Sequence, residues 1–134
     1  MGELQCELGI STERRVSNVL RDNGYWALFI PSVQGGQPFD IVASRYDRSI
    51  MIEVKNVNAG KRFPFSRIEA NQWASLKYAK EYAHCNNIGF AIYWKGSDWL
   101  SFLPYSAILD LQAKGEKSVA EDSCVDFVTW LGEV

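Results

Sequence analysis

Two periodicities of apolar residues divide the chain into expected helices and strands. Apolar positions recur every three or four residues in three stretches, as on one stripe of an amphipathic helix: residues 11–24, 66–86 and 105–114. Five shorter aromatic and aliphatic runs, each bounded by turn residues, are typical of β-strands: residues 25–30, 39–46, 50–56, 88–94 and 99–103. The pattern therefore predicts the order αβββαββα.

Local signals support these boundaries. Gly24 and Gly115 are placed to end the first and last helices, and residues 66–69 resemble the capping box that begins the second helix. The polar segments 47–49 and 95–98 separate neighbouring strands, so each pair is expected to form an antiparallel hairpin.

The element order predicts an α/β fold of the α+β type, in which helices flank a central mixed β-sheet. A chain of 134 residues with 47% apolar content suits a single domain, so we expect residues 1–134 to form one. For the C-terminal segment 107–134 the pattern leaves the structure open. Within it, residues 118–131 fit a helix as well as an extended segment.

The charge of the chain argues against binding nucleic acid through its overall field. The net charge is −2 and the pI is near 5.4. Residues 55–67, however, contain four basic side chains and no acidic one, so a local surface for phosphates remains possible.

Several site classes are disfavoured by what the chain contains. Its three cysteines are far apart and odd in number, which argues against a disulfide framework and a zinc site and favours buried thiols. With one histidine, His84, a histidine-ligated metal or a Ser-His-Asp hydrolase would rest on that residue alone. The chain has no apolar run of roughly 18 residues and no leader-like N-terminus, so we expect a cytoplasmic protein.

Three charged residues interrupt two apolar strands of the first hairpin. Glu53 and Lys55 share one face of their strand because side chains alternate. If the hairpin turn has two residues (47–48) or four (46–49), Val42 pairs with Glu53 and Asp40 with Lys55. Asp40 then joins the same face, about 7 Å or less from Glu53, whereas a three-residue turn would separate them. The four-residue turn is the preferred version.

The convergence of Asp40, Glu53 and Lys55 has a structural and a functional interpretation. A structural Asp40–Lys55 ion pair would offset part of the cost of burying these charges. The functional interpretation is a cation site, because two carboxylates at this separation can share one divalent ion. Three charges on one face with apolar flanks favour the functional interpretation.

The same segments resemble a known nuclease signature. PFD at residues 38–40 and IEVK at residues 52–55 resemble the PD-(D/E)xK motif, with Phe39 between the usual proline and aspartate. TERR at residues 12–15 resembles the N-terminal glutamate motif of archaeal-type Holliday-junction resolvases. FPFSRI at residues 63–68 is similar to bacterial RecU-type resolvases, as are later segments up to residue 106. The resemblance covers about residues 10–106 and implies a restriction-endonuclease-like core.

The resemblance implies a metal-dependent endodeoxyribonuclease that uses Mg²⁺, with Mn²⁺ as a possible substitute. Asp40, Glu53 and the Val54 carbonyl would bind the ion, and the resemblance assigns Glu13 to the same site. Lys55 would orient the attacking water and stabilise developing negative charge. By analogy with the superfamily, Gln72 would touch Lys55 or that water.

DNA contacts are expected from nine further residues. Each also has an ordinary interpretation as a surface charge or a connecting loop: Arg14, Arg15, Ser32, Gly35, Gly36, Gln37, Lys61, Arg62 and Arg67. Most of the five tryptophans are interpreted as core or dimer contacts rather than as base-stacking platforms. A two-fold interface is expected on the stripe of Ile68, Trp73, Leu76 and Ala79, or around Trp94 and Trp99.

The resulting hypothesis is a homodimeric Holliday-junction resolvase that acts on branched DNA and carries one active site in each copy. A second hypothesis is a nuclease of the same superfamily with another substrate, of the restriction, flap or single-strand repair type. A third is a non-catalytic DNA-binding subunit whose acidic residues serve only the structure.

Overall fold

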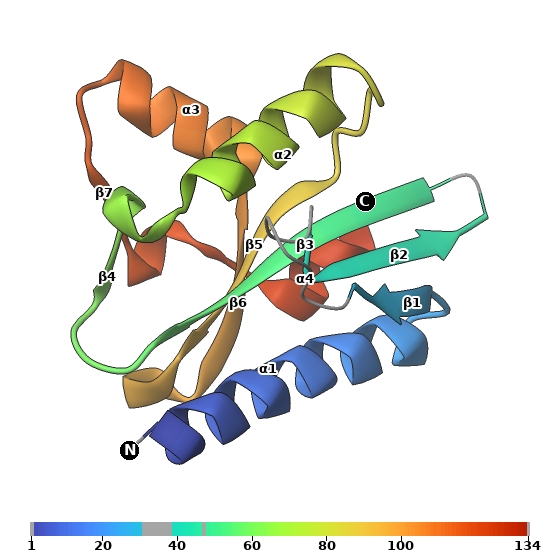
Figure 1. Cartoon of the computed structure of the whole chain (residues 1–134), viewed down its shortest axis with the longest axis horizontal. Helices are drawn as coiled ribbons and strands as arrows, with labels where there is room; N and C mark the ends of the chain where they lie inside the picture. The colour runs from blue at the N-terminus through green and yellow to red at the C-terminus, as the bar shows by residue number, and fades with distance from the viewer. Residues whose placement is uncertain (1, 31–38, 47, 134) are drawn as a thin grey trace.

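A six-stranded mixed sheet forms the centre of the computed structural model, which describes residues 2–30, 39–46 and 48–133, with side chains from residue 11 onward (Figure 1). The strands lie in the order β1-β2-β3-β5-β6-β8. β3 and β5 run parallel, and the other neighbours run antiparallel. The bounds are β1 (Trp26–Phe29), β2 (Ile41–Arg45), β3 (Arg48–Val57), β5 (Ile88–Trp94), β6 (Trp99–Pro104) and β8 (Val125–Asp126).

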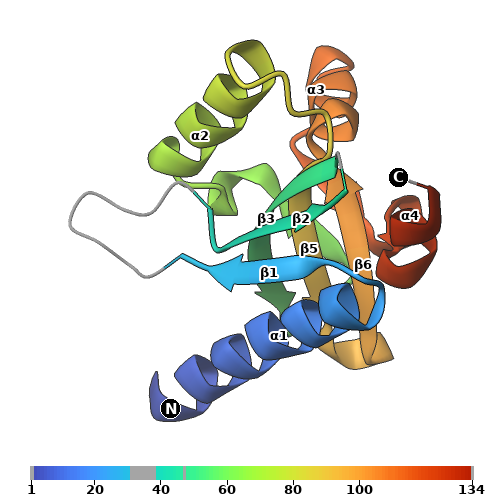
Figure 2. The same ribbon diagram turned by 90° about the vertical axis from the view of Figure 1, so that its right-hand side faces the viewer.

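Helices cover both faces of this sheet (Figure 2). α1 (Gly2–Asp22) and α4 (Phe127–Glu133) pack on one face, and α2 (Ala70–Glu81) and α3 (Tyr105–Ala113) pack on the other. β4 (Arg62–Pro64) and β7 (Ser118–Ala120) pair in a separate two-stranded sheet. Three short 3₁₀ segments complete the fold: η1 (Phe65–Arg67), η2 (Lys95–Ser97) and η3 (Glu121–Ser123).

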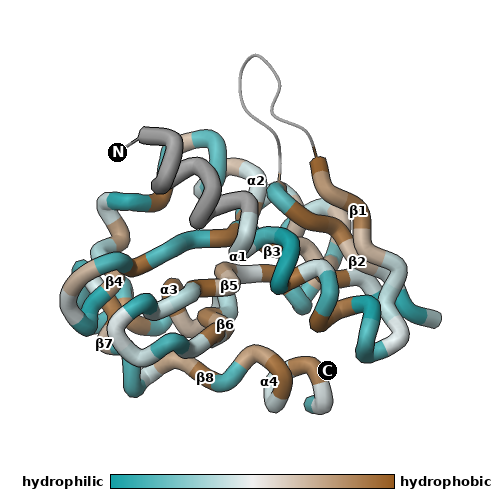
Figure 3. The backbone as a smooth tube through the Cα atoms, turned by 90° about the horizontal axis from the view of Figure 1, so that it is seen from below, coloured by the Kyte–Doolittle hydropathy of each residue, from teal (hydrophilic) through white to brown (hydrophobic). Residues whose placement is uncertain are grey.

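Alternation along β3 divides its side chains between two cores. Ile50 and Ile52 pack with Val16 and Leu20 of α1, whereas Met51 packs at the edge of the core beneath α2. Figure 3 shows hydrophobic segments of β3 and β5 in the interior, and a largely hydrophobic β1 at the edge of the sheet. The α2 side of β3 therefore receives Met51, Glu53 and Lys55, which places the charged residues beneath that helix.

The structure confirms the α+β class and contains the eight predicted elements in their predicted order, but it adds β4 before α2 and β7, β8 and α4 after α3, and it corrects several boundaries. The first helix begins at Gly2, not near residue 11, because the four-residue spacing of Thr12, Val16 and Leu20 extends back to Leu4 and Leu8 in the sequence. Its end is as predicted: Gly24 has φ +85°, and the N–H of Tyr25 donates to the Leu20 carbonyl at 3.0 Å.

Helix α2 is shorter than predicted at both ends. The segment 66–69 does not begin it, because residues 65–67 form η1 and Glu69 is the N-cap. It ends at Glu81 instead of reaching residue 86. Residues 118–131, which fitted either structure, contain both: two short strands, η3 and the start of α4.

The register of the first hairpin differs from the prediction. Val42 pairs with Met51 rather than with Glu53, and Arg45 pairs with Arg48. The strands are therefore shifted by two positions, which moves Asp40 from a place opposite Lys55 to one opposite Glu53. Because side chains alternate with a period of two, this shift preserves the shared face on which the site depends.

The two surfaces predicted for a dimer are mostly interior. Ile68, Leu76, Ala79 and Trp94 are buried in the core, so they are unavailable to a second copy. The stripe had helical spacing because it faces the sheet of its own chain. Cys85 and Cys124 are buried thiols as predicted, and the side chain of Cys6 lies outside the described part.

No helix in the described ranges combines the length and the apolar character needed to cross a membrane.

Candidate active site

Asp40 lies where β1, β2 and β3 meet. Its backbone N–H donates to the Ile52 carbonyl at 3.1 Å, and its carbonyl accepts the N–H of Ile30 at 2.9 Å. Its side-chain Oδ2 accepts the N–H of Val54 at 2.7 Å. Backbone and side chain together therefore fix this carboxylate against the middle of β3.

Glu53 is the buried acid of the site, with 1% of its surface exposed. Its Oε2 accepts a hydrogen bond from Nε2 of Gln72 in α2 at 2.9 Å. Its Oε1 is buried and has no hydrogen-bond partner among the described residues. A buried carboxylate oxygen without a partner is costly, so Glu53 is placed at the expense of stability.

The electrostatics of Glu53 follow from this burial. Its pKa is raised to about 9, first by burial and then by the charge of Asp40 and a hydrogen bond with that carboxyl. Lys55 and Gln72 act in the opposite direction and do not compensate. A divalent cation shared by the two carboxylates would remove the repulsion and give Oε1 a partner. Paired carboxylates are also the oxygen ligands that Mg²⁺ takes, so these residues fit such an ion.

Lys55 projects from the same face of β3 as Glu53. Its Nζ donates to the backbone carbonyl of Arg67 at 3.1 Å. Burial lowers the pKa of Lys55, and the carboxylates of Glu53 and Glu69 raise it by less. The amine is thus held in a defined place beside the two acids.

Glu13 approaches the site from α1 and is half-buried. Burial raises the pKa of Glu13, and the charge of Asp40 raises it further. Within residues 11–30, 39–46 and 48–133, however, no three acidic, histidine or cysteine side chains converge as one set of metal ligands. The contact of Glu13 with the ion therefore stays a prediction.

Gln72 has a different partner from the one expected. It was predicted to touch Lys55 or a water, yet its amide donates to Glu53, while its Oε1 accepts the N–H of Glu69 at 3.0 Å. Glu69 was not identified from the sequence. The available signal was its position three residues before Gln72, which is the spacing of a capping box.

The structure distributes the predicted DNA-contact residues over several surfaces. Arg14, Lys61, Arg62 and Arg67 are exposed. Arg15 turns toward the β5–β6 hairpin, where it lies 3.6 Å from the Asp98 carboxylate and 5.4 Å from the centre of the Tyr93 ring. Four further residues expected to contact DNA lie outside the described part of the chain: Ser32, Gly35, Gly36 and Gln37.

Comparison with known proteins identifies one family. The profile described as "Archaeal holliday junction resolvase (hjc)" matches residues 5–127. A search of curated proteins finds no match.

Two solved structures have the same arrangement of elements. The structure of Archaeoglobus fulgidus Hjc, described as a Holliday junction resolvase from an archaeal hyperthermophile, is similar with a TM-score of 0.67 and 19% identity. The match covers 92% of this chain and 100% of that one. The structure of D212, a nuclease from a fusellovirus, has a TM-score of 0.57 and 14% identity, and the match covers 98% of this chain and 90% of that one. At these identities the structures establish the fold.

Proposed function

The chain belongs to the archaeal Holliday junction resolvase family, and we propose that it resolves four-way DNA junctions by divalent-cation-dependent hydrolysis at Asp40 and Glu53. The family is one of structure-specific, junction-resolving nucleases. The finer parts of the proposal are the ion, the residues that hold it and the assembly that acts on the junction.

One observation carries the assignment of the site. Within the described ranges, the Oε1 atom of Glu53 is buried without a hydrogen-bond partner, and burial together with the neighbouring Asp40 carboxyl raises the pKa of Glu53. An isolated structural role would favour an amide or an apolar side chain at this position, because either avoids the cost of a buried charge. A bound cation accounts for a carboxylate at both positions.

We assign Asp40, Glu53 and the Val54 carbonyl as the groups that hold Mg²⁺, with Mn²⁺ as a substitute. When bound, the cation acts as a Lewis acid that polarises the scissile phosphodiester and makes water a better nucleophile. Gln72 holds one oxygen of Glu53, which leaves the other directed for ligation. Fixing a ligand from behind in this way maintains its orientation.

Lys55 and Glu13 act on either side of this pair. Lys55, anchored at the Arg67 carbonyl, would stabilise the negative charge that develops on the phosphate. Glu13, held beside Asp40 by α1, would accept a hydrogen bond from the attacking water or from water near the ion. Neither function requires Glu13 to be a direct ligand.

The DNA backbone is proposed to lie across the exposed cations near this site. Arg62 begins β4, Arg67 ends η1, and Lys61 directly precedes Arg62, with all three side chains exposed. Arg14 lies on α1 next to Glu13, and Ser32, Gly35, Gly36 and Gln37 remain part of the proposal. Arg15 is the weakest candidate, because Asp98 and Tyr93 already engage it. Such contacts give affinity without sequence preference, as a junction-reading protein requires.

We further propose that the active form is a homodimer. A four-way junction is resolved by two symmetrical cuts, and the described part of each chain provides one Asp40–Glu53 pair. Two copies related by a two-fold axis would present two such pairs to a two-fold substrate.

The proposed dimer surface is the apolar face formed by β1, β2, β3 and α2. Trp26 and Leu28 of β1 are 68% and 46% exposed on the side of the sheet opposite Ala27, which packs toward α1. The apolar face extends from β1 across β2 to β3, because Leu28 pairs with Val42 and Val42 pairs with Met51.

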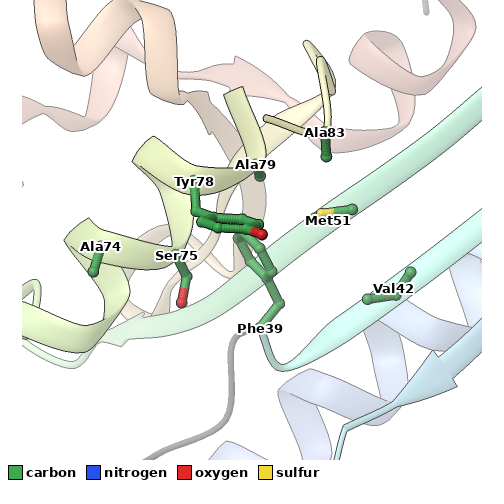
Figure 4. A pocket seen from close by; sticks show the side chains of 8 residues that line it. All are labelled: Phe39, Val42, Met51, Ala74, Ser75, Tyr78, Ala79 and Ala83. Carbon is green, nitrogen blue, oxygen red and sulfur yellow. The ribbon is translucent and has the colours of Figure 1, made fainter. Parts of the chain in front are cut away.

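A groove of about 470 Å³ continues the face up to α2. Figure 4 shows Tyr78 extending from α2 toward Phe39, with Met51 and Val42 on the neighbouring strands. Met51 is two positions from Glu53 on the same face of β3, so a second copy seated here would bring both active sites toward the two-fold axis. Exposed apolar faces of this kind mark association surfaces.

The discriminating experiment uses three labelled substrates, namely a four-way junction, a flap and a linear duplex, each with Mg²⁺, Mn²⁺ or EDTA. The proposal predicts paired nicks in the junction that require the cation, with far less cleavage of the other two. Equal cleavage of flap or duplex would indicate a different substrate for the same fold. Junction binding without cleavage in either metal would indicate a non-catalytic subunit.

A further inference from the structure

A hydrogen bond joins the N-terminal helix to the catalytic strand. Oγ1 of Thr12 donates to Oδ1 of Asn56 at 2.7 Å, across 44 residues of sequence. Thr12 is 3% exposed and directly precedes Glu13, while Asn56 directly follows Lys55. Each partner is therefore the chain neighbour of a residue that the proposed function uses.

Asn56 also connects to Lys55 through a second element. The guanidinium of Arg67 donates to the Asn56 carbonyl at 2.8 Å, and the carbonyl of Arg67 accepts the bond from Lys55 at 3.1 Å. The Arg67 guanidinium lies 5.5 Å from the centre of the Phe63 ring, which supports it from beneath. Thr12, Asn56, Arg67 and Lys55 thus form a continuous chain of bonds from α1 to η1.

The chemistry of Thr12 argues for a specific role. Thr12, Val16 and Leu20 follow one another at four-residue spacing on the buried side of α1. An apolar side chain of similar size would pack at this position as the other two do. The threonine hydroxyl instead donates a hydrogen bond to Asn56, on the strand that carries Glu53 and Lys55.

We propose that Thr12 and Asn56 are positioning residues, which hold the carboxylate of Glu13 beside Asp40 and the amine of Lys55 beside Glu53. The inference rests on the proposed function and extends it to two residues that have no titratable group. A helix that shifts or turns by about 1 Å would displace Glu13 from Asp40, and misplacement on this scale costs up to about 100-fold in rate.

The test is a double-mutant cycle between Thr12 and Glu13. Thr12→Val keeps the volume and removes the donor, Thr12→Ser restores a hydroxyl, and Glu13→Gln removes the charge that Thr12 is inferred to place. Ser17→Ala is the matched control, because Ser17 is equally buried in α1 and its hydroxyl has no partner among the described residues. Each variant is measured by single-turnover cleavage of a four-way junction and by calorimetric titration with Mn²⁺ in the absence of DNA.

We expect Thr12→Val to slow cleavage on the order of tenfold and to weaken Mn²⁺ binding, with Thr12→Ser and Ser17→Ala near the wild type. In the Glu13→Gln background, Thr12→Val should have a clearly smaller effect on both measurements, because only the part that acts through Asn56 and Lys55 remains. Equal factors in both backgrounds, or an unaffected Thr12→Val, would overturn the inference. A wild type that cleaves no junction would instead overturn the proposed function, and the Mn²⁺ titration would still decide the positioning role.

Discussion

The side-chain amide of Gln72 ties the start of α2 to the buried acid of the site: Nε2 donates to Glu53 at 2.9 Å while Oε1 accepts the N–H of Glu69 at 3.0 Å. The amide is therefore held at both ends, and its orientation is fixed by two different kinds of partner. The hydrogen bond from this amide in turn fixes the orientation of the Glu53 carboxylate.

We therefore expect Gln72→Ala to weaken Mn²⁺ binding by about 10- to 100-fold, the range for loss of a group that orients a ligand. Calorimetric titration with Mn²⁺ measures this directly. Gln112→Ala, an exposed glutamine in α3, is the matched control and should bind like the wild type. An unchanged affinity in Gln72→Ala would show that Glu53 keeps its position without the amide.

The raised pKa of Glu53 makes a prediction about stability in the absence of metal. Because the folded-state pKa is about 9 and the ordinary value is 4.5, the folded protein holds a proton there that the unfolded chain releases. This contribution to stability is fully present below pH 4.5 and is lost as the pH rises toward 9.

Glu53→Gln replaces the protonated acid with a neutral group of the same shape, so it should remove this pH dependence. We expect the variant to exceed the wild type in free energy of unfolding at pH 8 in EDTA by at least about 1 kcal/mol, because a shift of one pKa unit corresponds to about 1.4 kcal/mol. Urea titrations at pH 5.5 and pH 8 measure the difference. A variant less stable than the wild type at pH 8 would contradict the prediction that the raised pKa of Glu53 lowers the free energy of unfolding at this pH.

Lys55 should affect turnover rather than metal binding, since an ammonium cannot coordinate a cation. We expect Lys55→Met, which keeps the length of the side chain, to lower single-turnover cleavage by about 100- to 1000-fold, as for other groups that stabilise transition-state charge. Mn²⁺ affinity should stay within a few-fold of the wild type. The opposite result, weak metal binding with a normal rate at saturating metal, would remove Lys55 from the proposed chemistry.

The dimer surface is tested by a charge placed in its apolar face. Leu28→Glu should shift sedimentation from dimer to monomer, because it buries an unpaired carboxylate if the face is covered. Val128→Glu is the matched control, since Val128 is 53% exposed on α4, which packs on the other face of the sheet. If the wild type is a monomer, or if Val128→Glu alone dissociates the dimer, the proposed surface is wrong and another surface or another partner is required.

The shared face of Asp40 and Glu53 was predicted correctly from the sequence, although the predicted register of the two strands was wrong. Alternation fixes the face of a residue by parity, so a shift of two positions changes the partner and not the side of the sheet. The exact pair depends on where the turn lies, and neither Asp47-Arg48 nor the neighbouring residues form the Asn-Gly or Asp-Gly sequence that specifies a turn.

Contacts between distant segments were the part that the sequence did not reveal. The bond from Gln72 to Glu53 and the bond from Thr12 to Asn56 join residues of different elements, and no spacing rule applies across elements. Within one helix the rules were also ambiguous, because the spacing of Trp73, Leu76 and Ala79 in α2 is the same for a core face and for an interface. Only burial in the folded chain separates the two.

The central claim is that a cation held by Asp40 and Glu53 drives cleavage, and Asp40→Asn tests it most directly. The amide preserves shape and one acceptor while removing the charge, so binding of a labelled four-way junction in EDTA should remain within about twofold of the wild type. Single-turnover assays in Mg²⁺ and in Mn²⁺ should then show no paired nicks above the EDTA background. Cleavage at a rate like that of the wild type by this variant would contradict the account.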